Sequence, residues 1–299
     1  MPKVKDKVPK ILNSFDKFST KRVSYIFSTK NRPVLFEKSL RRIRSIVKPE
    51  DELIVIDGST NEQTLTIIKK YKRFIDKYIH ETDMSPGQGN NKGILVSKGK
   101  YIKLITDDDI FFSTAMEKAI KIMEKNSKID ILECGGTLYN VKTKKYYIYY
   151  KPPGINFGKN IDDLFKYRSN GLAIILRRKS LAKIGLFPTD LIADATFLIN
   201  AFKANAVIKF CRIKLYKQVI HSDNISGRPE IPNLIYEAIR DNSSKKYFLR
   251  YAINWRISKY PALKYVLLPV IFINNFIKKL GSKKGSLEKP IYRWDGGFS

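Results

Sequence analysis

Cysteine and histidine are scarce in this sequence, with two of each among 299 residues. Cys134 and Cys211 are too few and too widely spaced for a disulfide framework, and they lack the spacing of a cysteine zinc site. The first ten residues are basic and contain no apolar segment of the kind found in signal peptides. This cysteine usage indicates a reducing compartment, and we expect a cytoplasmic location.

Acidic residues are also few, because 28 Asp and Glu stand against 57 Lys and Arg, for a formal net charge of +29. Such a surface attracts polyanions, which include nucleic acid, anionic lipid headgroups and phosphate-bearing substrates. The lysines are dispersed along the chain, and neither a zinc-finger spacing nor an aromatic RNA-binding signature is present. A non-catalytic nucleic-acid-binding protein is therefore an alternative, but we expect no specific nucleic-acid partner.

Long apolar runs are missing as well. The run Tyr265–Ile273 is short and interrupted by Pro269, so it cannot span a bilayer. It lies in a basic region from Ile231 onward, in which Phe248 and Trp255 fall on one face of a predicted helix. Basic amphipathic helices can lie in the interface of an anionic membrane, which predicts peripheral attachment to its inner face. The alternative is a helical hairpin packed on the rest of the protein.

Strand-like and helix-like segments alternate from Arg22. The β-rich runs Val23–Thr29 and Leu53–Ile56 are each followed by apolar residues at helical spacing. This alternation predicts an α/β fold with a parallel, doubly wound sheet, whose ligand site lies at the carboxyl ends of the strands. We expect three regions: a basic extension over residues 1–21, an α/β domain over 22–230 and a basic helical region over 231–299.

Three consecutive carboxylates, Asp107, Asp108 and Asp109, end the apolar run that begins at Tyr101. They cannot be buried without a cation or strong donors, because desolvating an unpaired carboxylate is very costly. Carboxylates two residues apart on an extended segment point the same way, so Asp107 and Asp109 can share one divalent ion that takes further ligands from substrate phosphates. The alternative is a solvated turn whose aspartates cap the following helix.

Four motifs then occur in the order typical of one enzyme family. They are Ser28–Pro33 (STKNRP), Val55–Thr60 (VIDGST), Gly89–Ile94 (GNNKGI) and the aspartate triplet. Through them the chain, over roughly residues 22–225, resembles the GT-A glycosyltransferases of family 2. The resemblance implies a GT-A fold, with a Rossmann-like, mostly parallel sheet flanked by helices. It also implies transfer of a sugar, with inversion, from a nucleotide-diphosphate donor to a hydroxyl acceptor. The implied acceptor is a lipid-linked or cell-surface glycan, and the implied cofactor is Mg²⁺ or Mn²⁺.

The resemblance assigns donor-binding roles within these motifs. It puts Asp57 at the edge of the nucleoside base, flanked by Thr29 and Arg32. Asn91 and Lys92 follow a helix start predicted at about residue 90, where backbone N–H groups favour a phosphate. The alternative role for Asp57 is a cap of the next helix. The alternative for Asn91 and Lys92 is that they belong to an ordinary loop and helix cap. The family often has two aspartates before Gly-Ser-Thr, whereas this chain has one.

The same resemblance assigns Asp107 and Asp108 to the donor diphosphate, and Asp109 to the metal together with Asp107. His221 ends a β-rich run, and in many GT-A enzymes a histidine near this place completes the metal or diphosphate site. A lone histidine is more often structural, so that alternative stays open.

Asp194 is the candidate catalytic base. The family has a Glu-Asp or similar pair at a helix start here, whereas this chain has Ala193 before its single acid. Transfer to a hydroxyl group needs a base that removes the hydroxyl proton. The alternative role for Asp194 is an amino-terminal cap of the helix that reaches Phe202.

A sugar-nucleotide nucleotidyltransferase is the nearest enzymatic alternative. Such an enzyme needs a glycine-rich loop of the Gly-x-Gly-Thr-Arg type after its first strand, and Ser28–Pro33 is not one. Sugar transfer is therefore the function that the sequence favours.

Overall fold

The computed structural model describes residues 20–149, 151, 154, 160–221, 224 and 227–259. The chain divides into two compact units, Met1–Asn242 and Ser243–Ser299. The basic extension expected over residues 1–21, apart from Thr20 and Lys21, and the apolar run Tyr265–Ile273 lie outside the described residues.

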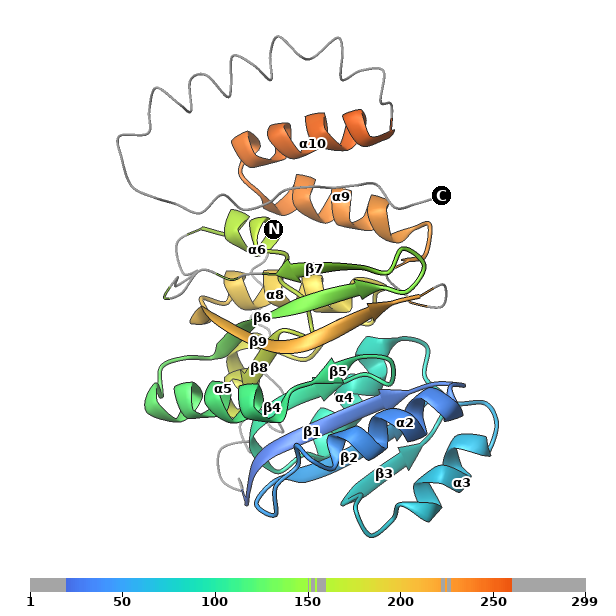
Figure 1. The fold of residues 1–299 in the computed structure, drawn as a ribbon. Coiled ribbons are helices and arrows are strands. Elements are labelled where there is room, and N and C mark those ends of the chain that lie inside the picture. Colours follow the sequence, from blue (N-terminus) through green and yellow to red (C-terminus); the bar gives the residue numbers. More distant parts are fainter. Residues whose placement is uncertain are drawn as a thin grey trace, which may run out of the picture. The chain divides into compact units, whose positions relative to one another are not determined.

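The first half of the large unit alternates strands and helices, as the sequence predicts (Figure 1). Its elements are β1 (Lys21–Thr29), α2 (Pro33–Ile43), β2 (Glu52–Asp57), α3 (Gln63–Lys70), β3 (Lys77–His80), α4 (Pro86–Val96) and β4 (Gly99–Ile105). The four strands pair in parallel in the order β3-β2-β1-β4. A crossover between parallel strands requires a long connection, and a helix supplies it in each case.

The second half extends the same sheet with mixed pairing. Its elements are β5 (Ile110–Phe111), α5 (Ser113–Lys125), β6 (Ile131–Asn140), β7 (Lys145–Tyr149), α6 (Asp162–Lys166), β8 (Ile174–Arg177), η3 (Arg178–Ser180), α7 (Leu181–Ile184), α8 (Ala193–Lys203), β9 (Ile208–Ile220) and α9 (Ile231–Asn242). The sheet continues from β4 in the order β8-β6-β9-β5, and β7 forms a hairpin with β6. Pairing is antiparallel throughout this half except between β6 and β9.

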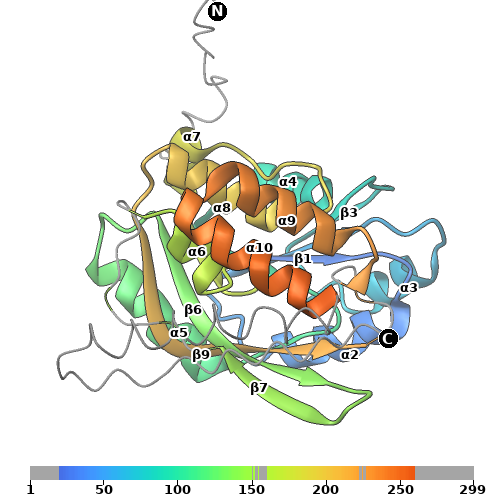
Figure 2. The same ribbon diagram turned by 90° about the horizontal axis from the view of Figure 1, so that it is seen from above.

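Helices cover both faces of the sheet, and each face has its own apolar core. On one face α2, α3 and α5 bury residues such as Phe36, Ile68 and Met116. On the other face α4, α7 and α8 bury Ile94, Leu181 and Phe197 against the strands. Figure 2 shows α4 and α8 on one side of β1 and α2 and α5 on the other. The predicted α/β sheet flanked by helices is therefore confirmed.

The register of the parallel strands brings the motif loops together. Thr29 at the end of β1 lies opposite Asp57 at the end of β2, and Phe27 lies opposite Ile105 at the end of β4. The three strands thus stop at one edge of the sheet. Loops that follow parallel strands at this edge are where ligands bind in open α/β sheets.

Helix α4 begins at Pro86, four residues before the predicted start at residue 90. The Ser85 hydroxyl accepts the N–H of Gln88, and proline stands at the first helical position, which are both favourable features of a helix start. The prediction was wrong because it treated the glycines of this segment as a flexible loop.

Helix α10 (Lys245–Lys259) belongs to the smaller unit. Phe248, Tyr251, Ala252 and Trp255 are half-buried, whereas Leu249 is exposed. Among the described residues, no helix combines the length and the apolar character needed to cross a membrane.

Candidate active site

An acidic cluster lies at the carboxyl edge of β1 and β4. One oxygen of Asp107 accepts the Thr29 hydroxyl at 2.8 Å, and the other lies 3.2 Å from Arg32 Nη1. The same Nη1 lies 3.1 Å from Asp108 Oδ2. Burial raises the pKa of Asp107, whereas the two carboxylates outweigh the burial of Arg32 and raise the pKa of its guanidinium. Arg32 therefore places positive charge between two neighbouring carboxylates.

The long strand β9 brings His221 to this cluster. Antiparallel pairing of β5 with β9 aligns the end of β9 with the aspartate triplet. The Nε2 atom of His221 lies 3.2 Å from Asp108 Oδ2, and Asn224 Nδ2 donates to the same oxygen at 3.0 Å. Asp108 thus faces one guanidinium, one imidazole and one amide.

Asp109 points elsewhere. Its Oδ2 accepts the Thr106 hydroxyl at 2.7 Å, and its Oδ1 accepts the N–H of Val219 at 2.9 Å. Burial, with the nearby charge of Asp108, raises the pKa of Asp109 to about 7. Both oxygens of Asp109 thus have partners that it does not share with Asp107, and the structure brings Asp107 together with Asp108 instead.

Asp57 is fully buried at the end of β2. Its two oxygens bind His80 Nδ1 at 2.8 Å and the N–H of Ser59 at 3.0 Å. The adjacent loops are joined by two further bonds, from Gly58 N–H to the Thr29 carbonyl and from Asn31 N–H to the Ser59 hydroxyl. The loop is therefore preorganised, and His80, for which the sequence offered no role, orients its carboxylate.

Asn91 and Lys92 are both engaged within the protein. The Asn91 amide donates to the Phe187 carbonyl at 2.7 Å and accepts the Phe187 N–H at 2.9 Å. The Lys92 ammonium donates to the Thr82 carbonyl at 3.1 Å and pairs with Glu81. Their donor-binding roles remain predictions, and these contacts support the structural alternative.

Asp194 lies in the first turn of α8. Its Oδ2 accepts the N–H of Gly171 at 2.9 Å, and its Oδ1 accepts the N–H of Ala195 at 2.8 Å. Burial raises the pKa of this carboxyl group, and the two N–H donors oppose the rise. A carboxylate in such a setting has the raised basicity that general-base chemistry uses.

The acidic cluster at the ends of β1 and β4 offers only part of the ligand set of a divalent cation. Within the described ranges, no three His, Cys, Asp or Glu side chains converge into a complete metal site. Asp108 Oδ2 and His221 Nε2, 3.2 Å apart, offer one carboxylate oxygen and one imidazole nitrogen, and Arg32 links them to Asp107. This donor set suits Mg²⁺ or Mn²⁺ if the ion takes its remaining ligands from a diphosphate and water.

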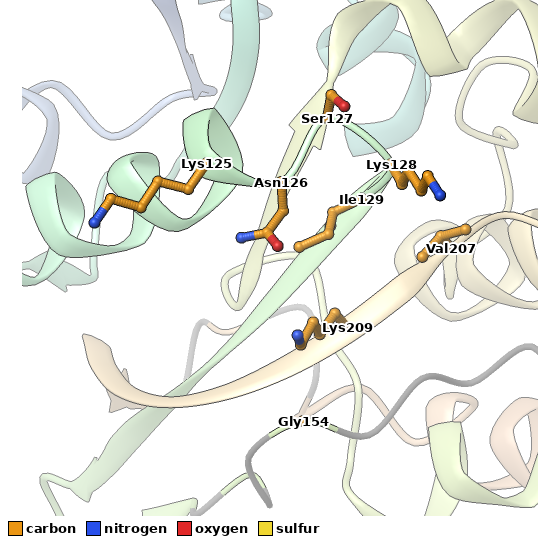
Figure 3. A pocket seen from close by; sticks show the side chains of 8 residues that line it. All are labelled: Lys125, Asn126, Ser127, Lys128, Ile129, Gly154, Val207 and Lys209. Carbon is orange, nitrogen blue, oxygen red and sulfur yellow. The ribbon is translucent and has the colours of Figure 1, made fainter.

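Among the described residues, a cavity of about 350 Å³ lies at the opposite edge of the sheet, near the starts of β6 and β9. Three lysines, Lys125, Lys128 and Lys209, line it, and no carboxylate does. In Figure 3 the side chains of Lys125 and Lys128 point apart. The described lining of the cavity therefore lacks carboxylate, imidazole and thiol groups, and the side chains of Lys125 and Lys128 do not converge.

Solved structures with this fold are glycosyltransferases of the GT-A type. TarS of Staphylococcus aureus, residues 1–349 in complex with UDP-GlcNAc, has a TM-score of 0.58 and 18% identity, covering 80% of this chain and 73% of that one. The mannosyltransferase PcManGT of Pyrobaculum calidifontis, in complex with GDP-Man and Mn²⁺, has a TM-score of 0.52 and 14% identity over 88% of each chain. At these identities the likeness shows the fold, and it confirms the predicted GT-A class.

Within this class the chain belongs to glycosyl transferase family 2, whose profile matches residues 24–185. An uncharacterized glycosyltransferase of Methanocaldococcus jannaschii is 25% identical over 284 residues, which cover 86% of this chain and 91% of that protein. The family and the enzyme class expected from the four motifs are thus confirmed.

Proposed function

We propose that the chain transfers a sugar from a nucleotide-diphosphate donor to a hydroxyl group of a lipid-linked or cell-surface glycan, with inversion at the anomeric carbon. The observation that carries this proposal is the meeting of Arg32, Asp107, Asp108 and His221 at the sheet edge where Asp57 also ends its strand. A mixed cluster of acids and bases at this edge suits a ligand that combines a nucleoside with a diphosphate.

On the donor side, Thr29, Arg32 and Asp57 line the nucleoside end. Arg32 is poised to exchange its carboxylate partners for phosphate oxygens, to which a guanidinium binds well. Mg²⁺ or Mn²⁺ would be held by Asp108 and His221, with Asp107 beside them, and it would stabilise the negative charge of the departing diphosphate. The geometry favours Asp108 over Asp109 in this role.

On the acceptor side, Asp194 takes the proton of the attacking hydroxyl group. The hydroxyl oxygen forms a bond to the anomeric carbon as the bond from that carbon to the diphosphate oxygen breaks. Burial of Asp194 makes it a better proton acceptor than an exposed carboxylate. The N–H group of Gly171 keeps its Oδ2 in place.

A nucleotide-sugar screen tests the donor assignment. UDP-GlcNAc and GDP-mannose are the first compounds to try, because they are held by the solved neighbours. We expect one nucleotide sugar to bind in a Mg²⁺- or Mn²⁺-dependent manner and to be hydrolysed slowly, which calorimetry and release of the nucleoside diphosphate measure. Salt-sensitive retention on DNA, without binding of any nucleotide sugar, would instead support the nucleic-acid-binding alternative.

Membrane attachment is a separate prediction about the smaller unit. Because α9 belongs to the large unit, the truncation that tests it ends at Asn242 rather than before Ile231. We expect removal of residues 243–299 to weaken binding to phosphatidylglycerol-containing vesicles by at least about tenfold, since several basic residues are lost. Vesicle co-sedimentation measures this, and neutral phosphatidylcholine vesicles are the control. Equal binding by the full and truncated chains would contradict a membrane role.

A further inference from the structure

Three charged side chains are completely buried: Lys103 on β4, Glu133 on β6 and Lys151 just after β7. Burial lowers the pKa of Lys103 to about 7, lowers that of Lys151 and raises that of Glu133. Burying charge is costly unless it is paired and hydrogen-bonded, and apolar residues of similar size often give equal stability. The stability of the core therefore does not explain why the fold keeps these groups.

Glu133 and Lys151 hold the segment of residues 167–171, here called the anchored loop. The Ser169 hydroxyl donates to Glu133 Oε2 at 2.6 Å, and the Asn170 N–H donates to Oε1 at 3.1 Å. Lys151 Nζ lies 3.3 Å from Glu133 Oε2 and donates to the Tyr167 carbonyl at 2.6 Å. One buried ion pair thus fixes three successive parts of the loop.

Lys103 holds the next residues of the chain. Its Nζ donates to the carbonyls of Leu172 at 2.6 Å and Ile174 at 3.3 Å. Gly171 stands between Asn170, which Glu133 holds, and Leu172, which Lys103 holds, and its N–H donates to Asp194 Oδ2. All three buried charges therefore contact the segment that delivers one N–H group to the proposed base.

Gly171 also permits a close approach. A Cβ atom at this position would lie 3.3 Å from the Cβ of Asp194, tighter than an ordinary contact. The loop has one further conformational cost, because Arg168 adopts a φ of 49°, which lies in the left-handed region. The hydrogen bonds that anchor the loop offset this cost, and they keep the Gly171 N–H within hydrogen-bond distance of the Asp194 carboxylate.

We propose that Glu133, paired with Lys151, is a positioning residue for sugar transfer: it fixes the anchored loop, and the loop fixes the Asp194 carboxylate toward the acceptor. This proposal rests on the role of Asp194 in the proposed function. It accounts for the buried ion pair, since a small displacement of a catalytic group costs far more in rate than in stability.

Glu133→Gln is the test, and the chain contains a closely matched control in Glu52. Glu52 is also buried, accepts a serine hydroxyl at 2.6 Å from Ser24, accepts the Lys98 N–H and pairs with Lys77 at 3.7 Å. It stands at the start of β2, at the opposite edge of the sheet. Glu52→Gln therefore removes a similar buried carboxylate far from the site.

Hydrogen–deuterium exchange provides a readout that needs no substrate. We expect Glu133→Gln to raise exchange of peptides that cover the anchored loop by about tenfold or more, and Glu52→Gln to leave them unchanged. Hydrolysis of the nucleotide sugar found in the screen should slow by about 10–100-fold in Glu133→Gln, with an unchanged KM for the donor. Unchanged loop exchange, or equal slowing by the two variants, overturns the positioning role.

Gly171→Ala gives a second route if Glu133→Gln does not fold. The added methyl group pushes on Asp194 and leaves the buried ion pair intact. We expect the same fall in rate with an unchanged donor KM, and a normal rate overturns the proposal. Failure of this proposal can be told apart from failure of the proposed function. A normal rate in Asp194→Asn would show that Asp194 is not the base. A normal rate in Glu133→Gln and Gly171→Ala, with a reduced rate in Asp194→Asn, would reject only the positioning role of Glu133.

Discussion

Asp194→Asn should lower sugar transfer by about 10²–10⁴-fold, the range typical of losing a general base, while donor affinity stays near that of the wild type. The variant keeps the size of the side chain and one oxygen for the Gly171 N–H, but it cannot accept a proton. Donor affinity should persist because the donor-side residues come from other strands. Calorimetry with the nucleotide sugar and a transfer or donor-hydrolysis assay measure the two quantities separately.

Stability does not distinguish a base from a helix cap at this position. Asp194 accepts two backbone N–H groups, and asparagine offers one oxygen, so one N–H loses its acceptor at a cost of about 1–3 kcal/mol. We therefore expect a lower melting temperature in either case. Asp130→Asn is the matched control, since Asp130 accepts the Val207 N–H at 2.8 Å and the Ser180 hydroxyl at 2.6 Å at the opposite sheet edge.

A transfer rate in Asp194→Asn that matches Asp130→Asn would remove Asp194 from the mechanism and leave it as a cap. A rate loss confined to Asp194→Asn would establish its chemical role, because each variant removes one acceptor oxygen from a hydrogen-bonded carboxylate.

The sheet and its functional edge were predictable because they depend on local patterns. Val23–Thr29 and Leu53–Ile56 are apolar, β-rich runs, and each is followed by a helical pattern, so the parallel pairing of β1 and β2 follows from general rules of α/β folds. The polar residues after these runs then had to share one edge. The sequence could therefore predict that these residues meet at one edge, without any knowledge of their side-chain contacts.

The direction of each side chain at that edge was not predictable, because it depends on partners far away in sequence. Asp109 turns toward the N–H of Val219 on β9, and Asn91 closes on Phe187. Cys134 and Cys211, widely spaced in sequence, lie with their sulfurs 3.3 Å apart on neighbouring strands. Local spacing contains no signal for such contacts, and Asn224 and Gly171 were missed for the same reason.

Buried charge was likewise invisible to pattern reasoning. Lys151 looks like a surface residue in a basic, tyrosine-rich stretch, and Glu133 interrupts the run Ile129–Cys134, yet both are completely buried. A period-two pattern shows which residues share a face of a strand, but not whether a loop covers that face. Here the anchored loop covers it, and its polar backbone supplies the partners that make the buried ion pair tolerable.

Asp108→Asn should lower transfer by at least about 10²-fold and abolish the response to added Mg²⁺ or Mn²⁺, whereas Asp109→Asn should mainly reduce stability. Asp108 faces Arg32, His221 and Asn224, so it stands where a cation and a diphosphate would be held. Asp109 instead binds Thr106 and a backbone N–H, and replacing it disturbs the packing of β9. Each of the two variants, Asp108→Asn and Asp109→Asn, therefore serves as the control for the other.

Electron paramagnetic resonance measures the binding of Mn²⁺ in the presence of donor, and this readout does not depend on turnover. Wild-type protein stripped with EDTA should lose transfer and regain it when Mn²⁺ or Mg²⁺ is restored, and Asp108→Asn should not regain it. If Asp109→Asn loses Mn²⁺ while Asp108→Asn keeps it, the pairing of Asp107 with Asp109 expected from the sequence is right, and the side chains rearrange when donor binds. If EDTA leaves wild-type turnover undiminished, the enzyme needs no divalent ion, and Arg32 and His221 are then the groups that neutralise the departing diphosphate.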